Sequence, residues 1–562
     1  MIGGIIACLY LGALWYVAPL LAPNDRTVPT QLRNVAIVGI GLPLVLASLH
    51  ALYAPVVWVV LAVFVVARMR RRIEATQADL GMCLTLAIAA VLVWPPLVRP
   101  VLDGDTLLYH LPIAASWAQA HSLWTTASPA WFYPPGSEAL ASGLLLTAGR
   151  WSLPLAGMIP LFMIVARLYA YARASGASSL AAGSVALAFV STPIVALQTG
   201  SLENDVWLAA FVVEVLAGGG DWKTLGVTSL IKPVGWMWGL LNAVSARMRA
   251  QALLVGMMPL ALWLVRDAIL LRGAIVPPEP MPPYFATTIV GGIPQSLIDL
   301  ASGIGAHTPQ TIVWLVMIPL GLAFERSRPF ALVGIAGLLL YVMLPLSYAY
   351  GGTNWALAGT SLRFAMPALA CGGLVAATLA SRAPRVATIC CGLLVLLGMG
   401  TFLQIYSSDS ASHWAWLIAV IAIVAALLAS RTRDASVAAF IIMLVIAGGW
   451  YAEQRGPSIL SEGLRDDNGT PTHLFAWLAQ QAPDRMVAVN VRVGLLILAS
   501  PTTEVIPATA STMCRLAIET RAPLVIASNE YGDSHIHAEE RAQALRCGKA
   551  VFDDGSALVV AP

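Results

Sequence analysis

Charged residues are scarce in this sequence. Of 562 residues, only 11% are Asp, Glu, Lys or Arg, whereas 58% are hydrophobic and the mean hydropathy is +0.78. A soluble domain carries about 25% charged residues, so a water-soluble globule is excluded, together with a disordered chain, a coiled coil and collagen. The net charge of +3 is too small and too scattered to indicate nucleic-acid binding. The composition predicts a polytopic membrane protein.

Cysteine is also scarce, and its spacing does not indicate zinc. The seven cysteines form no CxxC pair, and the sequence has no His-rich run. Five cysteines lie in apolar stretches, where a thiol is usually a small core residue. Cys514 and Cys547 lie in the only long polar region, near the C-terminus, and can pair if that region faces an oxidising compartment.

Long apolar runs recur along the chain, and a membrane span needs about 20 mostly apolar residues. The first run has no basic segment before it, so it is predicted to be a span and not a cleaved signal peptide. Lys232-Pro233 interrupts the apolar segment 224–241, which is predicted to be a short broken helix at the interface. About 14 spans are predicted, centred on 4–22, 34–50, 54–68, 82–99, 151–171, 178–197, 206–217, 251–266, 310–323, 330–347, 364–380, 386–404, 414–430 and 436–451.

Basic residues predict the orientation of these spans. The positive-inside rule places the cluster 68–72, with its four arginines, in the cytoplasm. Counting spans from there puts the other arginine-containing turns inside as well, provided that 224–241 does not cross. The remaining loops, 100–150, 198–205, 267–309 and 348–363, are then external, as is the tail from about 452.

Carboxylates gather at the external ends of the spans. Asp103 and Asp105 follow the fourth span, and Glu203 and Asp205 precede the seventh. Carboxylates so close to lipid tend to be paired, metal-bound or raised in pKa. Two acidic pairs on one face can bind a divalent cation or a hydroxyl-bearing acceptor. The alternatives are a solvated span end for the first pair and a helix N-cap, at Asn204 or Asp205, for the second.

Arginines lie at the same external ends. Arg266, Arg272 and Arg363 suit phosphate, because a guanidinium donates two parallel hydrogen bonds. The alternative is snorkelling to the interface. It fits Arg266 better than Arg363, which lies on the side that the positive-inside rule disfavours.

The order of the motifs resembles that of a known superfamily. The Asp pair is followed by Tyr109-His110-Leu111-Pro112, Tyr133-Pro134-Pro135-Gly136 and Glu138. This series looks like the first external loop of GT-C membrane glycosyltransferases. The superfamily includes bacterial aminoarabinose transferases and protein O-mannosyltransferases, which use sugars carried on polyprenyl phosphate.

Further matches follow in the expected order, so that the resemblance covers roughly residues 82–380. Asp205 lies where the family often has an acidic residue, and Leu230-Ile231-Lys232-Pro233 resembles a short cytoplasmic-side segment that ends in Lys. Val265-Arg266-Asp267, with Arg272-Gly273 and Pro277 after it, resembles the family motif R-N…G-N-P…P. Arg363-Phe364, with Pro367 after it, resembles the family motif R-Y/F…P. The chain departs from the family in having three extra spans, within residues 1–75, before the acidic loop and its preceding span, Asp267 in place of Asn, and D-G-D in place of D-E.

The resemblance implies an inverting transfer of sugar from a polyprenyl-phosphate donor to a hydroxyl acceptor. It places the catalytic base at Asp105, four residues before Tyr109, with Asp103 as the second choice. Glu203, Asp205, Tyr109 and His110 are predicted to lie in an acceptor or metal region, although a lone interfacial His is more often structural. Because the family has metal-dependent and metal-independent members, Mg or Mn on Asp103, Asp105 and Asp205 stays open. The residues implied to bind the donor phosphate are Arg363, Arg266, Arg272 and Lys232.

The aromatic residues of the first loop allow two interpretations. Trp117, Trp124, Trp131 and Tyr133 can stack on sugar rings or anchor the protein at the membrane interface. The long loop 272–309, with His307, is predicted to be a lid that excludes water.

Three regions are predicted: additional N-terminal helices in 1–75, a GT-C-like catalytic domain in 76–452 and an external α/β domain in 453–562. In the last region, helical segments 472–481, 511–520 and 536–547 alternate with strand-like segments 486–491, 523–528, 549–553 and 556–560. No phosphate-binding loop or catalytic triad occurs in it. It is predicted to recognise the acceptor or to support the fold.

The sequence therefore favours a glycosyltransferase (EC 2.4 class) of the bacterial inner membrane, with its active face and C-terminus extracytoplasmic. Its expected partners are the lipid donor, membrane lipids and a glycan, lipid or protein acceptor. The alternatives are a lipid-linked polysaccharide polymerase or ligase with a diphosphate donor, a transporter or flippase, and a polytopic scaffold. Against transport, the sequence has no internal repeat and no carboxylate buried in the middle of a span.

Overall fold

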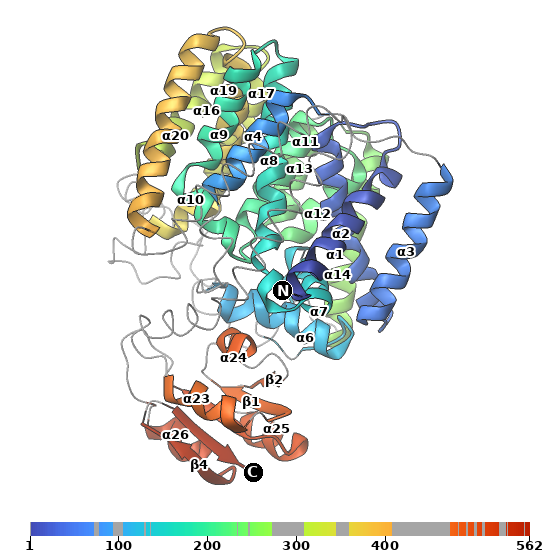
Figure 1. The fold of residues 1–562 in the computed structure, drawn as a ribbon, viewed down its shortest axis with the longest axis vertical. Helices are drawn as coiled ribbons and strands as arrows, with labels where there is room; N and C mark the ends of the chain where they lie inside the picture. The colour runs from blue at the N-terminus through green and yellow to red at the C-terminus, as the bar shows by residue number, and fades with distance from the viewer. Residues whose placement is uncertain are drawn as a thin grey trace.

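The helical part of the chain forms a bundle, with an α/β unit at one end (Figure 1). The computed structural model describes residues 2–71, 78–93, 105–126, 128, 131–134, 136–232, 234–245, 248–272, 308–343, 359–406, 472–481, 483–489, 493–499, 503–508, 512–527, 536, 538–555 and 557–562. This arrangement confirms the predicted fold class of an all-α bundle with a small C-terminal α/β domain. The predicted spans 414–430 and 436–451 lie outside the described residues.

Each predicted span within the described residues coincides with a helix or with a bent pair of helices. The first and last helices of the bundle are α1 (Ile2–Val17) and α20 (Pro384–Tyr406). Between them lie α2 (Val28–Ser48), α3 (Ala54–Arg71), α4 (Leu80–Leu92), α6 (Leu111–Ala120), α7 (Gly136–Ala148), α8 (Pro154–Ala174), α9 (Ser179–Val190), α10 (Pro193–Ala196), α11 (Asp205–Ala217), α12 (Trp222–Ile231), α13 (Gly235–Ser245), α14 (Ala250–Leu270), α16 (Thr308–Leu320), α17 (Arg328–Met343) and α19 (Met366–Leu379).

Short 3-10 and π segments connect several of these helices. They are η1 (Ala18–Leu21), η2 (Thr106–His110, a π-helix), η3 (Arg150–Ser152), η4 (Leu197–Gly200), η6 (Gly321–Ala323) and η8 (Gly359–Ala365). In the part of the chain that the structure describes, five helices are long and apolar enough to cross a membrane, or six if the pair bent by 71° at 190–193 is one span. The predicted total of about 14 spans stays a prediction.

Segment 224–241 forms a helical hairpin that enters the bundle. α12 runs back along α11, and α13 returns beside α12, with Gly235 close to Thr228 and Gly239 close to Leu225. Most of α12 is buried. The prediction that this segment is not a single span agrees with the hairpin, but its predicted place at the interface was wrong. The chain buries the break at Lys232 because the lysine has carboxylate partners there.

The N-terminal helices α1 and α2 pack directly on the rest of the bundle. Both contact α7, and α2 also contacts α8 and α12. At the end of the bundle far from the α/β unit, the buried Arg33 lies 3.7 Å from Asp221, the N-cap of α12. Burial disfavours ionisation of Asp221, but Arg33 and hydrogen bonds from Thr224 outweigh it and hold the pKa of this carboxyl below 3.8. The N-terminal helices are thus fastened to the hairpin.

The α/β unit is a five-stranded sheet with helices on both faces. Its strands are β1 (Arg485–Val489), β2 (Glu504–Pro507), β3 (Leu524–Ala527), β4 (Lys549–Asp553) and β5 (Ala557–Ala561), in the order β2-β1-β3-β5-β4. The first three are parallel, and β5 is antiparallel to both of its neighbours. Its helices are α23 (Thr472–Gln481), α24 (Val493–Ala499), α25 (Met513–Thr520) and α26 (Ala538–Ala544).

The two faces of this sheet have separate apolar surroundings, because successive side chains of a strand point to opposite sides. Val487 and Leu524 pack with α25 in a core that belongs to the α/β unit. Met486 and Val525 belong instead to the large apolar cluster that continues into the helical bundle. On the outer side, Cys514 and Cys547 form a disulfide, with their Cα atoms 4.9 Å apart, so the pairing that the sequence left open is made.

Candidate active site

The first predicted site residue, Asp105, lies at the start of an unusual helix. It immediately precedes η2, a π-helix; such turns are rare and are frequent at functional sites. The hydroxyl of Thr106 accepts a hydrogen bond of 2.9 Å from the backbone N–H of Leu202, so η2 is fastened to the second acidic loop. The hydroxyl of Tyr109 donates to Asp105 Oδ2 at 3.4 Å. Asp103 lies outside the described residues.

Arg363 joins the two acidic loops. From η8, its Nη2 donates to Asp105 Oδ2 and its Nη1 donates to Glu203 Oε1, while Nε lies 3.9 Å from Asp205 Oδ2. The side chain of Arg363 is only 11% exposed, and those of the three carboxylates are 16%, 9% and 3% exposed. Residues 258 and 160 positions apart in sequence therefore meet in one largely dry cluster.

Lys232, at the tip of the α12–α13 hairpin, completes this cluster. Its Nζ pairs with Asp205 Oδ1 and lies 4.5 Å from the centroid of the Phe364 ring. We name the following five residues the acidic cluster: Asp105, Glu203, Asp205, Lys232 and Arg363. When all five side chains are ionised, the cluster has three negative and two positive charges. The structure thus brings together the predicted base, the acidic residues of the second loop and two predicted phosphate ligands.

Two tyrosines and a histidine line one side of the cluster. Burial, together with the Asp105 carboxylate, raises the pKa of Tyr109 well above 10.0, and the same two causes raise the pKa of Tyr133. Both phenols therefore remain protonated near neutral pH and can act only as hydrogen-bond donors or neutral acceptors. The buried His110 pairs through Nδ1 with Glu138 Oε1, and its ring centroid lies 4.2 Å from that of Tyr109.

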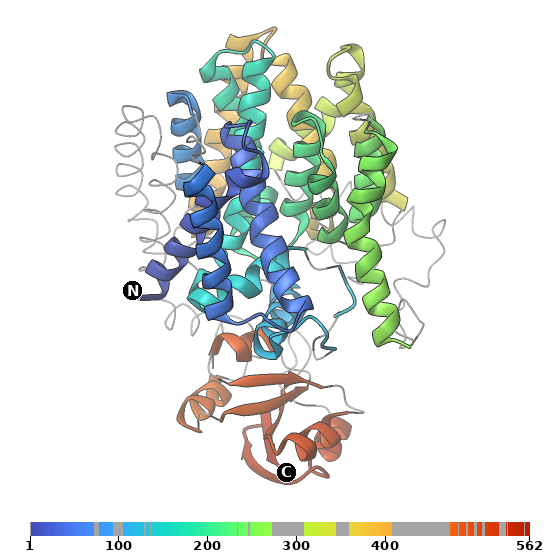
Figure 2. The same cartoon turned by 90° about the vertical axis from the view of Figure 1, so that its right-hand side faces the viewer.

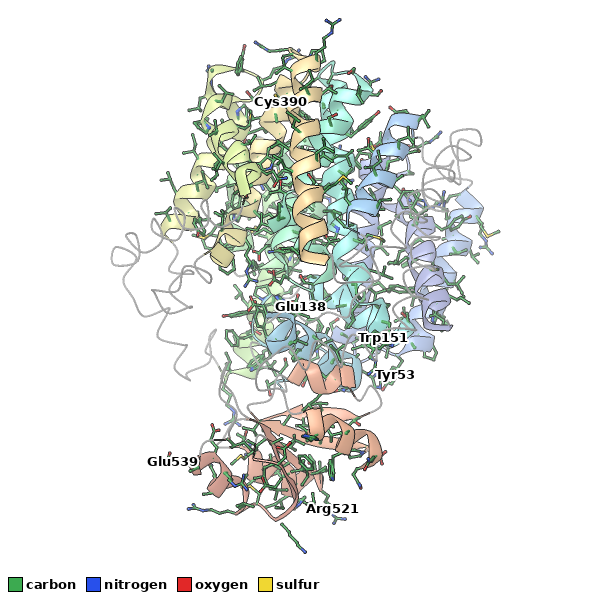
Figure 3. All side chains as sticks on the ribbon, turned by 60° about the vertical axis from the view of Figure 1, so that its left-hand side comes forward. Tyr53, Glu138, Trp151, Cys390, Arg521 and Glu539 are labelled. Carbon is green, nitrogen blue, oxygen red and sulfur yellow. A yellow bond between two sulfur atoms is a disulfide. The ribbon has the colours of Figure 1, made fainter. Side chains whose placement is uncertain are left out.

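Glu138 positions His110 in addition to being part of the first-loop motif. It lies in the first turn of α7, at the end of the bundle that faces the α/β unit (Figure 3), and it also accepts a 3.0 Å hydrogen bond from Ser137. Its carboxylate fixes the orientation of the His110 ring. This pairing was not predicted from the sequence, because a spacing of 28 residues across a loop gives no local signal.

Arg266 makes its contacts with a different set of residues. Its guanidinium donates to the carbonyls of Leu123, Thr125 and Trp131 at 2.5–3.2 Å, and to Asp267 at 2.6 Å. The guanidinium also lies 4.2 Å from the centroid of the Trp263 ring. In this structure Arg266 fastens the segment that carries these carbonyls to the end of α14. Arg272 follows α14, is exposed and has a positive φ of 54°.

The described carboxylates do not fit a cation site in this arrangement. Among the residues that the structure describes, no three His, Cys, Asp or Glu side chains are grouped as metal ligands. Asp105 and Asp205 instead direct oxygens at Arg363 and Lys232, which lie where a cation would have to be.

The aromatic residues of the first loop differ in their surroundings. Trp117 is 1% exposed and packs at 5.9 Å against Trp263, so its ring is part of the core. Trp124 is 36% exposed, and its indole N–H donates to Ser48 O at 3.0 Å. Tyr133 packs edge-on against Tyr109 beside the acidic cluster. The predicted lid segment, including His307, lies outside the described residues apart from residue 272 and residues 308–309.

The α/β unit reaches the site through α24. This helix contacts η2 and α6, and the α/β unit lies below the helix ends in both views of the ribbon (Figures 1 and 2). A Cβ atom on Gly494 would lie 2.6 Å from the carbonyl oxygen of Leu107, so only glycine permits this approach. α24 and β2 were not predicted from the sequence, because both are too short to show a clear hydrophobic periodicity.

Gly494→Ala is expected to push α24 away from η2 and so displace Asp105. Because misplacement of a catalytic group by about 1 Å can cost a hundredfold in rate, we expect turnover to fall by roughly ten- to a hundredfold. Gly400→Ala is the matched control, since a Cβ there meets nothing within 4 Å. Equal turnover of the two variants would show that α24 does not position η2.

Comparisons with known proteins give a likeness only at the level of structure. No protein-family model matches the sequence, and no curated protein matches it significantly. Among solved structures, the chain is similar to ArnT from Cupriavidus metallidurans bound to undecaprenyl phosphate, with a TM-score of 0.49 and 15% identity. For the apo state of the same protein, the TM-score is 0.47 and the identity 17%. Both alignments cover 85% of this chain and 97% of the other.

Proposed function

We propose that the protein is an inverting membrane glycosyltransferase that moves a sugar from a polyprenyl-phosphate donor to a hydroxyl acceptor. The observation that supports this best is the acidic cluster, in which a carboxylate and two cations from distant segments meet at one end of an apolar bundle. Such a reaction needs a base for the acceptor hydroxyl and positive charge for the departing phosphate. Asp105 is the proposed base, and Arg363 and Lys232 are the proposed phosphate ligands.

The proposed reaction is a single displacement. The acceptor O–H bond breaks and its proton passes to Asp105, while the acceptor oxygen forms a bond to the anomeric carbon. The bond from that carbon to the phosphate oxygen breaks, and polyprenyl phosphate leaves with the electron pair. Attack from the face opposite the leaving group inverts the anomeric carbon.

Donor binding requires an exchange of partners at Arg363. In the described structure the guanidinium is paired with Asp105 and Glu203. A phosphate that approaches Arg363 must displace at least one of these carboxylates, because both are anionic and compete for the same N–H groups. If Asp105 is displaced, its oxygen becomes available to accept the proton. The same exchange would then bind the donor and release the base.

We place this reaction on the extracytoplasmic face of the bacterial inner membrane. The proposal follows the predicted orientation, in which the arginine-rich turns are cytoplasmic. The α/β unit contacts η2 through α24, so it lies on the same face as Asp105. A disulfide in this unit suits an oxidising compartment. The acceptor, whether glycan, lipid or protein, would approach from this side.

The experiment that tests the proposal is an assay of purified protein in lipid nanodiscs with a panel of radiolabelled polyprenyl-phosphate sugars and membrane-extract acceptors. We expect release of polyprenyl phosphate together with a labelled product whose anomeric configuration is inverted. Turnover only with diphosphate donors would favour a polymerase or ligase. If no donor is bound or turned over while the protein is folded, the transferase proposal is wrong, and transport assays come next.

A groove on the bundle offers a place for the polyprenyl chain. It has a volume of about 700 Å³, lies between α2, α12 and α14, and is lined almost wholly by apolar side chains such as Ile40, Leu230 and Met258. α12 forms one wall and leads to Lys232. We propose that the chain of the donor lies along this groove.

Gly41→Leu tests this place directly. Gly41 lines the groove, and a Cβ there would meet nothing within 4 Å, so a leucine side chain can extend from this position into the groove. We expect the KM for a long-chain donor to rise several-fold, because apolar area buried by the chain is lost, while a short-chain donor is unaffected. Gly392→Leu, another open helical glycine, is the control. An unchanged KM for the long-chain donor would exclude the groove.

A further inference from the structure

The α12–α13 hairpin is held at its tip by the side chain of Asn204. The Nδ2 atom of Asn204 donates a 2.8 Å hydrogen bond to the carbonyl oxygen of Ile231, the last residue of α12. Asn204 is 5% exposed, and its Oδ1 has no partner among the described residues, so this bond is the only one that the amide makes. Burial of an amide oxygen without a partner costs free energy. We therefore attribute the asparagine at this position to the hydrogen bond that its Nδ2 donates to Ile231.

This hydrogen bond gives a partner to the Ile231 carbonyl, which lies at the C-terminal end of α12. The last carbonyls of any helix lack an intrahelical partner. Lys232 cannot continue α12, because the proline that follows it disfavours the helical conformation; its φ and ψ are −150° and 157°. Asn204 therefore caps α12 from a neighbouring segment, one residue before the extended lysine.

The end of α12 is also in contact with α7. A Cβ on Gly136, the first residue of α7, would lie 2.7 Å from Ile231 Cδ1 and 3.2 Å from the carbonyl oxygen of Leu230. The backbone of the tip thus contacts both Gly136 and Asn204. Removal of the Asn204 amide would leave the contact with α7 in place.

Asn204 belongs to a turn in which each residue contacts a different element of the site. Glu203 binds Arg363, Asn204 binds the backbone of the hairpin, and Asp205 binds the ammonium group of Lys232. We propose that Asn204 is a positioning residue: it sets the place of Lys232 in the acidic cluster, and through Lys232 it sets the affinity for the donor phosphate. The proposal rests on the function proposed above and adds a residue to it that does not touch the donor.

The test is a double-mutant cycle of Asn204→Ala and Lys232→Ala, with the full chain in nanodiscs. The measured quantities are the Kd for a long-chain polyprenyl phosphate without sugar, and kcat and KM for the donor. We expect Asn204→Ala to raise Kd and KM roughly tenfold, the effect of one lost hydrogen bond, with a smaller change in kcat. In the Lys232→Ala background the same change should raise Kd by less than about twofold.

Asn34→Ala is the control. Asn34 is also buried and donates through Nδ2 to a backbone carbonyl, that of Ala18 at 3.2 Å, while its Oδ1 accepts from Arg33 at 3.2 and 3.3 Å. It should lower Tm at least as much as Asn204→Ala and leave Kd and KM unchanged. If Asn204→Ala does not fold, Asn204→Ser, which keeps a hydroxyl donor, takes its place in the cycle.

Each outcome decides the question. A tenfold effect of Asn204→Ala that persists without Lys232, or a wild-type Kd in a folded Asn204 variant, would overturn the positioning role alone. Failure of the wild-type protein to bind polyprenyl phosphate would instead overturn the proposed function, and the inference with it.

Discussion

Asp105→Asn is expected to lower kcat for sugar transfer by about a hundred- to ten-thousandfold, the usual contribution of a general base. The amide has the shape of the carboxylate but cannot take the acceptor proton. Because the neutral side chain no longer competes with phosphate for Arg363, the affinity for polyprenyl phosphate should stay the same or increase. A loss of turnover together with retained or tighter donor binding is therefore the expected signature, measured as kcat and as Kd for the donor lipid.

Asp79→Asn is the control for this experiment. Asp79 caps α4 by accepting a 2.6 Å hydrogen bond from the N–H of Met82, a role that asparagine also performs. It should therefore keep nearly wild-type turnover. If Asp105→Asn retains more than about a tenth of the wild-type kcat, Asp105 is not the base. Asp103, which precedes it by two residues, is then the next candidate.

Arg363→Met is expected to remove both stability and donor binding. The substitution leaves Asp105, Glu203 and Asp205 largely buried, with Lys232 as the remaining cation of the acidic cluster. Removal of one partner from a buried ion pair costs about 3–5 kcal/mol, so the free energy of unfolding should fall by about that amount. Loss of positive charge at the leaving phosphate should lower kcat/KM by about a hundredfold or more.

A second substitution separates these two effects. Glu203→Gln in the Arg363→Met background removes one unbalanced carboxylate, so Tm should recover in part while transfer stays lost. Arg167→Met is the matched control, because Arg167 forms a buried 2.6 Å pair with Glu214 between α8 and α11, apart from the acidic cluster. This control should be destabilised but keep its donor Kd. Recovery of transfer along with Tm in the double variant would show that Arg363 serves the fold and not the phosphate.

The acidic cluster was predictable in its members but not in its contacts. Asp105, Asp205, Lys232 and Arg363 were recognisable because charged groups at the ends of apolar runs are costly unless they are paired or functional. The sequence could not show that Arg363 bridges both acidic loops, since the choice of an ion-pair partner depends on distances between segments far apart in the chain. Arg266 illustrates the same limit: its residue type suits phosphate, but its neighbours in the fold are backbone carbonyls.

The hairpin and α24 were missed for a related reason. A break such as Lys232-Pro233 indicates where a helix ends, but not whether its tip lies at the membrane surface or inside the bundle. The tip is buried because Asn204 and Asp205 supply partners for its carbonyl and its ammonium group. α24 has only seven residues, so its periodicity is too short to read, and its contact with η2 depends on a glycine nearly 400 positions away from Leu107.

The sequence by itself determined that the chain is a bundle of apolar helices followed by an α/β unit, because hydrophobic period and composition are properties of consecutive residues. The tertiary structure alone decided which charges meet. It placed Arg363 between Asp105 and Glu203, fixed Lys232 through Asn204, and brought Gly494 against Leu107. These contacts join segments that are distant in sequence, and a charge in a dry interior takes whichever opposite charge the packing of the helices puts within reach.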